Sequence, residues 1–183
     1  MLERALTLFT TRGFNGVGVE ELAAAAGVTK PTLYHYFGNK QGLLETLIAE
    51  RYDPFLDDLE RAAFYHRRDL TRSLTMVVRT YLDFAQREAQ LFRMVIASVL
   101  TACDDRASQI MAERMARQDA ILRRLFQEAS QDYGNMVGRH HLAAASLHAT
   151  MLAYLQLAEQ GEMTLDDAAI WRLIQQFSYG IYS

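Results

Sequence analysis

Turn-forming residues are concentrated at the start of this chain, and their distribution constrains the fold more than any other feature. Six of the ten glycines lie before position 43, and the next one is Gly134. Proline occurs only at Pro31 and Pro54. A protein built from strands needs such residues throughout, because each strand is followed by a turn. The pattern therefore predicts an all-α protein with short helices first and longer helices after them.

Apolar residues recur at helical spacing in both regions of the chain. In the first region the spacing predicts helices over 2–12, 19–26, 30–36 and 40 to about 52. Pro54 should kink or end the fourth of these helices. In the second region the spacing predicts helices over 74–85, 91–100, 111–129, 139–159 and 164–182. We therefore expect about nine helices in total.

The composition excludes several classes of protein. Half of the residues are hydrophobic, so the chain can bury a core. No apolar run approaches the roughly 18 residues that span a bilayer, and the N-terminus lacks the pattern of a secretory signal. Cys103 is the single cysteine, and no spacing typical of a zinc site is present. We expect a cytoplasmic protein with no membrane partner, metal or cofactor.

The charge of the chain does not by itself indicate nucleic-acid binding. The net charge is −3, and residues 1–51 carry five basic and five acidic side chains, which cancel. A strongly basic patch is the usual footprint of a protein that binds DNA. Any prediction of DNA binding must therefore depend on a motif.

The segment 19–37 has the pattern of a helix-turn-helix. Two short helices that cross steeply need a small residue where they meet and a residue that tolerates positive φ in the turn. Ala23 and Gly27 stand four residues apart to meet these needs. Leu22, Val28 and Leu33 then face inward as a shared core.

The second helix of this motif leaves polar and aromatic side chains on its outer surface. With Leu33 turned inward, the outward residues near the helix start are Lys30, Thr32, Tyr34 and His35. Pro31 lies in the first turn, where its missing N–H is not needed. The free N–H groups of a helix N-terminus also favour a phosphate. These residues are predicted to contact a DNA groove.

The region 2–47 resembles the DNA-binding region of the TetR family of repressors. The matching positions are Ala5-Leu6 with Phe9, Gly13-Phe14, Glu21-Leu22-Ala23, Ala26-Gly27-Val28, Leu33-Tyr34-His35-Tyr36-Phe37, Lys40 and Leu43-Leu44. Gly18 stands where that family usually has a Ser or Thr helix cap, although glycine is an acceptable cap. Met1 lies within the first predicted helix, so we expect the basic arm that many relatives carry to be absent, with a truncated or misassigned start as the alternative.

The resemblance implies a domain organisation and specific DNA contacts. It implies a DNA-binding domain over 1–46 and a ligand-binding and dimerisation domain over 47–183. It implies base or sugar contacts from Lys30, Thr32, Tyr34 and His35. It implies phosphate contacts from Thr29, Tyr36 and Lys40.

The resemblance also implies that the last two helices pair with their copies in a homodimer. Small residues keep one of these helices slim, and the other carries an apolar stripe. The predicted interface residues are Ala145, Ala149, Ile170, Leu173, Ile174, Phe177 and Ile181. A two-fold axis would present two reading helices to successive major grooves, so the operator should be an inverted repeat. The alternative for the stripe is the core of a monomer.

A small-molecule cavity is expected among the fourth to eighth predicted helices. Flexible methionines and aromatic side chains suit an adaptable apolar pocket. The predicted lining residues are Phe84, Phe92, Met111, Met115, His148, Met151 and Tyr154. Met76 and Met94 are further candidates, and His148 or Arg93 would supply a polar group there. For most of these residues, ordinary core packing is the alternative.

The function predicted from the sequence is a ligand-responsive transcription regulator, a repressor that a small molecule releases from its operator. An enzyme on a helical scaffold is the first alternative, but no nucleophile–base pair or phosphate loop supports it. A protein-interaction module that keeps the helix-turn-helix only as a scaffold is the second. Salt-dependent binding to DNA would separate this module from the regulator.

Overall fold

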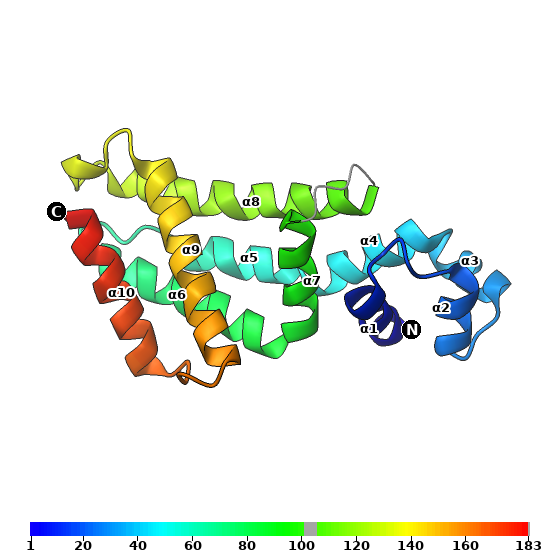
Figure 1. Cartoon of the computed structure of the whole chain (residues 1–183). Helices are drawn as coiled ribbons and strands as arrows, with labels where there is room; N and C mark the ends of the chain where they lie inside the picture. The colour runs from blue at the N-terminus through cyan, green and yellow to red at the C-terminus, as the bar shows by residue number, and fades with distance from the viewer. Residues whose placement is uncertain (101–105, 183) are drawn as a thin grey trace. The chain divides into compact units, whose positions relative to one another are not determined.

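The computed structural model describes the backbone of residues 1–100 and 106–182, and every regular element in those ranges is helical (Figure 1). The all-α prediction is confirmed. The helices are α1 Leu2–Arg12, α2 Val19–Ala25, α3 Lys30–Phe37, α4 Lys40–Arg51, α5 Asp53–Ala62, α6 Leu70–Arg87, α7 Ala89–Leu100, α8 Arg106–Ala129, the 3-10 helix η1 Gly134–Met136, α9 His140–Glu159 and α10 Asp167–Tyr182.

Helix α5 is the α-helix that the sequence prediction did not name. Helix α4 ends at Arg51, as expected from Pro54, but a new helix begins at Asp53. Proline is tolerated in a first helical turn, because the N–H it lacks has no partner there. Phe55, Leu56 and Leu59 follow at helical spacing, and all three are buried.

The chain divides into two compact units, and each is interrupted in sequence. The first unit comprises Met1–Phe55 and Glu88–Met115. In it, α1 packs against α2, α4 and α7 through its buried residues Ala5, Leu6 and Phe9. Arg51 at the end of α4 adds ion pairs to Glu3 of α1 and, at 3.3 Å, to Glu88. These contacts hold α4 against α1.

The second unit comprises Leu56–Arg87 and Ala116–Ser183. Its helices α6, α9 and α10 pack against one another (Figure 1). Their apolar stripes meet in a core that includes Val77, Leu147 and Leu173, each fully buried. Buried Ser73 donates a hydrogen bond to the Phe64 carbonyl (3.0 Å).

The division by packing groups α7 and the start of α8 with the N-terminal helices. The predicted end of the DNA-binding domain at residue 46 is a statement about function and not about packing. This division does not test it, and it stays a prediction. Among the described residues, no helix has the length and apolar character needed to cross a bilayer.

Candidate DNA-binding surface, ligand pocket and dimer face

Helices α2 and α3 form the helix-turn-helix that the motif predicts. Gly27 in the turn has φ of +69°, a conformation that glycine adopts at low cost. The Val28 N–H donates to the Ala23 carbonyl (3.0 Å) and closes the turn. Leu22 and Leu33 are buried between the helices. This packing fixes the direction in which α3 presents its outer side chains.

Helix α3 begins with a side-chain cap. Thr29 accepts a hydrogen bond from the Thr32 N–H (3.3 Å), and the two hydroxyls lie 2.8 Å apart. Gly38 ends the helix with φ of +71°. Asn39 then caps α4 by accepting from the Gly42 N–H (2.9 Å). A predicted phosphate contact from Thr29 would therefore share an oxygen that already serves the helix.

The predicted groove residues of α3 are largely exposed. Tyr34 is 40% and Tyr36 70% exposed, and Lys30 and His35 also lie on the surface, whereas Thr32 is half-buried. The Tyr36 ring contacts the His35 ring, with 5.2 Å between their centroids, but most of it faces solvent. Exposed tyrosines suit hydrogen bonds to phosphates and base edges. The DNA contacts themselves stay predictions.

Lys30 has an intramolecular partner in the same motif. Its ammonium pairs with Glu20 of α2 and lies 5.7 Å from the centroid of the Tyr34 ring. The hydrogen bond that Lys30 donates to Glu20 raises the pKa of Lys30, and the same contact lowers the pKa of Glu20. Lys30 is therefore fully charged near neutral pH. Two of its N–H groups remain for a phosphate or a base edge, although the Glu20 carboxylate beside them repels a phosphate.

Lys40 has a structural role that the sequence did not indicate. Its ammonium donates hydrogen bonds to the carbonyls of Phe14 (2.9 Å) and Val17 (3.0 Å). It also lies 4.3 Å from the centroid of the Phe14 ring, within the range of a cation–π interaction. Lys40 thus joins the first residue of α4 to the loop between α1 and α2. One N–H remains for the predicted phosphate contact.

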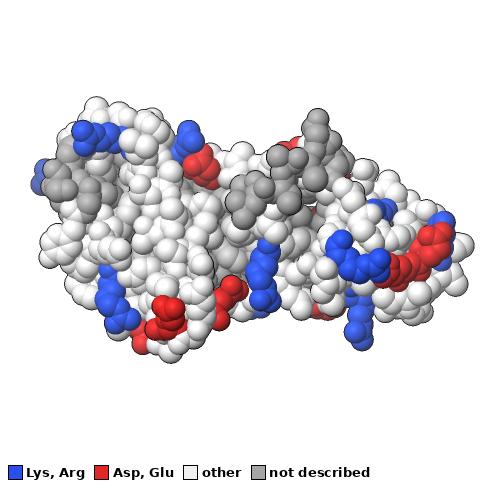
Figure 2. Space-filling model, in the orientation of Figure 1, with Lys and Arg blue, Asp and Glu red and all other residues white. Residues whose placement is uncertain are grey.

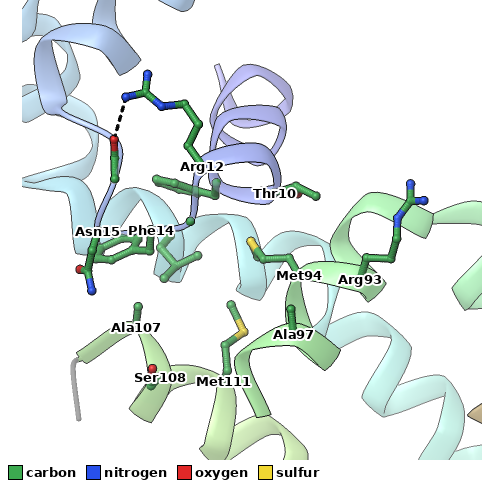
Figure 3. A pocket seen from close by; sticks show the side chains of 14 residues that line it. Thr10, Arg12, Phe14, Asn15, Arg93, Met94, Ala97, Ala107, Ser108 and Met111 are labelled. Atoms are coloured by element: carbon green, nitrogen blue, oxygen red, sulfur yellow. Dashed lines mark hydrogen bonds between the residues drawn. The ribbon is translucent and has the colours of Figure 1, made fainter. Parts of the chain in front are cut away.

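A pocket of about 510 Å³ lies in the first unit, beside the loop between α1 and α2 (Figure 3). Its walls come from the end of α1, this loop, Leu44 of α4, and residues of α7 and α8. The lining residues are Phe9, Thr10, Arg12, Gly13, Phe14, Asn15, Gly16, Leu44, Arg93, Met94, Ala97, Ala107, Ser108 and Met111. Of the residues predicted to line a cavity, Arg93, Met94 and Met111 belong to this set. The lining residues of α1 and of the α1–α2 loop were not predicted, because a cavity was expected only among the fourth to eighth predicted helices.

The other predicted ligand residues have packing roles in the structure. Phe84 and Met151 are fully buried, and Phe92 and Tyr154 are nearly so. Met115 accepts a hydrogen bond from the Tyr52 hydroxyl (3.6 Å). Burial raises the pKa of Tyr52, which therefore stays protonated as this donor.

His148 belongs to a polar cluster inside the second unit. Its Nε2 lies 2.8 Å from the Tyr81 hydroxyl and 3.1 Å from the Gln118 amide nitrogen. Tyr81 and Gln118 are both buried. Burial lowers the pKa of His148, so the imidazole is neutral near pH 7. A ligand role for His148 would require that it exchange these partners.

The predicted dimer stripe of α10 is occupied by the chain's own core. Ile170, Leu173, Ile174 and Phe177 are all buried in the single chain, because α10 packs this face against α6 and α9. This burial corrects the prediction for these four residues: little of their surface is left for a partner. The Ile181 side chain lies outside the described residues.

A different face of α9 and α10 is exposed and apolar. Ala145 and Ala149, both predicted for the interface, lie on it. On α9 it continues with Leu142, which is 58% exposed, and on α10 it includes Trp171, 54% exposed, and Tyr179. Figure 2 shows the surface over these helices largely free of charge, with charged groups near its edges. We refer to these residues as the α9–α10 face.

The described residues contain no group of three or more His, Cys, Asp or Glu side chains that could hold a metal ion. The features with a possible role in binding are therefore the surface of α3, the pocket and the α9–α10 face.

Comparison with known proteins places the helix-turn-helix in a known group. Residues 1–47 match the family model described as "Bacterial regulatory proteins, tetR family". The transcriptional activator FasR of Mycolicibacterium smegmatis is 26% identical over 181 residues, which cover 98% of this chain and 80% of FasR. The transcriptional repressor KstR2 of Rhodococcus jostii is 37% identical over 59 residues, 32% of this chain and 27% of KstR2.

Two solved structures share the fold over nearly the whole chain. FadR from Bacillus subtilis, in complex with stearoyl-CoA, has a TM-score of 0.71 and 18% identity, covering 96% of this chain and 95% of FadR. AibR, in complex with isovaleryl coenzyme A and operator DNA, has a TM-score of 0.66 and 22% identity, covering 97% of this chain and 94% of AibR.

Proposed function

Because the chain belongs to the tetR family of bacterial regulatory proteins, we propose that it binds an operator duplex as a homodimer and represses transcription until a small molecule releases it. The observation that carries the proposal is the exposed outer surface of α3, set at a fixed angle by the turn at Gly27. In this proposal residues 1–46 bind DNA, and residues 47–183 bind the ligand and form the dimer.

The DNA contacts in this proposal come from the predicted set: Thr29, Lys30, Thr32, Tyr34, His35, Tyr36 and Lys40. Tyr34, His35 and Tyr36 have the strongest support, because all three are exposed on α3 and none of them caps the helix. Lys30 would reach the duplex with the N–H groups that Glu20 leaves, and Lys40 would position the motif while one N–H reaches a phosphate.

The dimer in this proposal forms through the α9–α10 face. An exposed apolar surface on two neighbouring helices is costly in a monomer, and small residues such as Ala145 and Ala149 let helices approach closely. A two-fold axis would relate the two α3 helices of the dimer, so the operator would be an inverted repeat.

The effector in this proposal is an acyl thioester or a closely related molecule. Two proteins with the same fold, FadR of Bacillus subtilis and AibR, form complexes with acyl-CoA ligands. Release would follow if the ligand binds better to a form that fits DNA poorly, because effector and operator must then weaken each other's binding equally.

Operator binding is tested by gel shift with DNA from upstream of the chain's own gene, and with duplexes selected from a random pool. The chain should bind a subset of sequences, and affinity should fall steeply with salt concentration. Tyr34→Ala should weaken specific binding about tenfold, within the range for one base-reading side chain. Phe64→Ala, at an exposed aromatic residue of the second unit, should bind as the wild type does.

Two outcomes would contradict the proposal. Absence of any sequence preference would exclude an operator-binding function, and unchanged binding by Tyr34→Ala would exclude α3 as the reading helix.

A reporter placed behind the selected operator decides the sign of regulation. Its expression should fall when the chain is produced, and a rise would make the protein an activator.

A further inference from the structure

Helices α2 and α3 are joined by an ion pair as well as by their shared core. The ammonium of Lys30, the first residue of α3, donates a hydrogen bond to the carboxylate of Glu20 in the first turn of α2. The two side chains are 43% and 74% exposed. An ion pair so open to water contributes little to stability. Its place on the predicted reading surface therefore indicates a role in binding.

Lys30 is also held from a second side. Its ammonium lies 5.7 Å from the centroid of the Tyr34 ring, one helical turn further along α3 and within the range of a cation–π interaction. A lysine side chain is otherwise flexible. Glu20 and Tyr34 together limit the directions in which Lys30 can point, which lowers the entropy cost of placing it on one acceptor. Two N–H groups of the ammonium remain for that acceptor.

The helix-turn-helix carries more negative than positive charge. Residues 19–37 contain two carboxylates, Glu20 and Glu21, and one lysine. Glu21 pairs with Arg12 of α1, as Glu20 does with Lys30. Figure 2 shows acidic and basic groups side by side over these helices. The carboxylates therefore reduce the attraction to phosphates, which every duplex sequence offers equally.

A carboxylate next to Lys30 discriminates between the two kinds of acceptor in DNA. A phosphate is an anion, so Glu20 repels it from Lys30. An acceptor atom on a base edge carries no net charge, so it meets less repulsion while it gains a hydrogen bond from the ammonium. Guanine offers lysine two such atoms in the major groove, N7 and O6. Glu20 therefore weakens the phosphate contacts of Lys30, which carry no sequence information, more than a base contact, which does.

We propose that Glu20 is a specificity-determining residue: it directs Lys30 to a guanine of the operator and suppresses contacts between Lys30 and the phosphates of other sequences. The proposal deepens the function given above and rests on it, since it names a base that α3 reads and a residue that controls the reading. Glu20 acts through Lys30 as a positioning residue. Its loss should therefore lower specificity only while Lys30 is present.

The first test is Glu20→Gln, which keeps the shape of the side chain and removes its charge. Binding of the selected operator and of a scrambled duplex is measured by fluorescence anisotropy at several salt concentrations. The affinity for the scrambled duplex should rise about fivefold, and the slope of log affinity against log salt should steepen by about 0.9 per copy, as expected for one added phosphate contact. The operator should gain less, so the ratio of the two affinities falls. An unchanged ratio, or an unchanged slope, would overturn the proposal.

Glu21→Gln is the matched control, because Glu21 lies in the same turn of α2 and pairs with Arg12 instead of a residue of α3. It should change the affinities for operator and scrambled duplex by the same factor. Lys30→Gln removes the partner of Glu20, so adding Glu20→Gln to it should leave the ratio unaltered. A fall in the ratio as large in Glu21→Gln, or one that persists without Lys30, would show that Glu20 acts only by its charge and would refute the positioning role. Circular dichroism and thermal unfolding establish that the variants are folded.

The base is identified by selecting duplexes from a random pool with the wild type and with Lys30→Gln. The wild-type pool should hold a guanine at one position of each half-site that the Lys30→Gln pool has lost, and Glu20→Gln should retain it more weakly. Identical pools would exclude a base contact from Lys30. The two proposals fail in different ways: a wild type that selects no sequence contradicts the proposed function, whereas a selective wild type whose choice Glu20→Gln leaves unchanged contradicts this inference alone.

Discussion

Lys40 holds the loop between α1 and α2 from the first turn of α4. Its ammonium is half-buried and donates to two backbone carbonyls, those of Phe14 and Val17. Val17 is buried, so its carbonyl would otherwise have restricted access to water. The Phe14 ring adds a cation–π contact. Among the predicted DNA-contacting residues, Lys40 is therefore one whose loss should affect folding as well as binding.

We expect Lys40→Met to destabilise the chain by about 1–3 kcal/mol, because two hydrogen bonds from a charged donor and a cation–π contact are lost together. Urea unfolding measures the change. Lys30→Met is the matched control: its ion pair with Glu20 is exposed, and such pairs contribute little. Equal destabilisation by both substitutions would show that the Lys40 contacts have no special structural weight.

His148 makes the stability of the second unit depend on pH. Its pKa is lowered from 6.5 by burial, with Asp119 raising it by a smaller amount. The unfolded chain therefore takes up a proton at a higher pH than the folded chain. Stability is full above the unfolded pKa of His148 and falls as pH drops from there through the folded pKa.

The free energy of unfolding should thus decrease between about pH 7.5 and pH 5.5 more in the wild type than in His148→Gln. Glutamine keeps a polar group beside Tyr81 and Gln118 but does not titrate in this range. His141→Gln is the control, because His141 is exposed on the same helix. Parallel pH profiles of wild type and His148→Gln would contradict the role assigned to burial.

At the scale of helices, α3 and α4 approach closely at Gly42. A side chain on Gly42 would place its Cβ against the Phe37 carbonyl oxygen, a backbone atom that cannot move without shifting α3. Gly42 lies in the first turn of α4, where its N–H also donates to the Asn39 cap. Glycine is therefore needed here for space.

We expect Gly42→Ala to destabilise the chain by about 1–3 kcal/mol, the usual cost of forcing extra volume into a packed site, although alanine is the better helix former. Thermal unfolding reports the change. Gly134→Ala is the control: Gly134 has open space around its Cβ position. Specific DNA affinity should also fall in Gly42→Ala, because α3 must move. A variant as stable as the wild type would show that the two helices can separate without cost.

The sequence predicted the first four helices well because their boundaries have local causes. Gly27, Gly38 and Asn39 stop or start helices through their own backbone conformation or side chain, which needs no tertiary information. Helix α5 was not predicted, since Pro54 ends one helix and is also tolerated in the first turn of the next. The apolar spacing of Phe55, Leu56 and Leu59 was the signal that could have revealed it.

The remaining sites could not be predicted from helical spacing. The stripe through Ile170 and Phe177 indicates which face of α10 is buried, but it does not indicate whether the chain's own helices or a partner cover it. Phe84 and Met151 are apolar because they pack in a core, and a ligand would select the same residue types. The pocket near Phe14 joins segments far apart in sequence, so only the folded chain brings it together.

For the whole molecule, the α9–α10 face is the surface through which we propose that two copies pair. On α9 its exposed residues include the small Ala145 and Ala149, and on α10 they include Trp171, which has a large side chain. We expect Ala149→Glu to convert the dimer to a monomer, because a buried unpaired carboxylate at a close helix contact is strongly unfavourable. Sedimentation velocity measures the mass.

The same substitution should weaken binding to an inverted-repeat operator far more than binding to a single half-site, since a monomer presents one α3 helix where the dimer presents two. Phe64→Glu, at an exposed aromatic residue that is not among the residues of this face, is the matched control and should stay dimeric. A wild-type monomer, or an Ala149→Glu variant that remains dimeric, would contradict pairing through this face. A monomeric variant that still bound the full operator tightly would mean that each copy reads DNA alone.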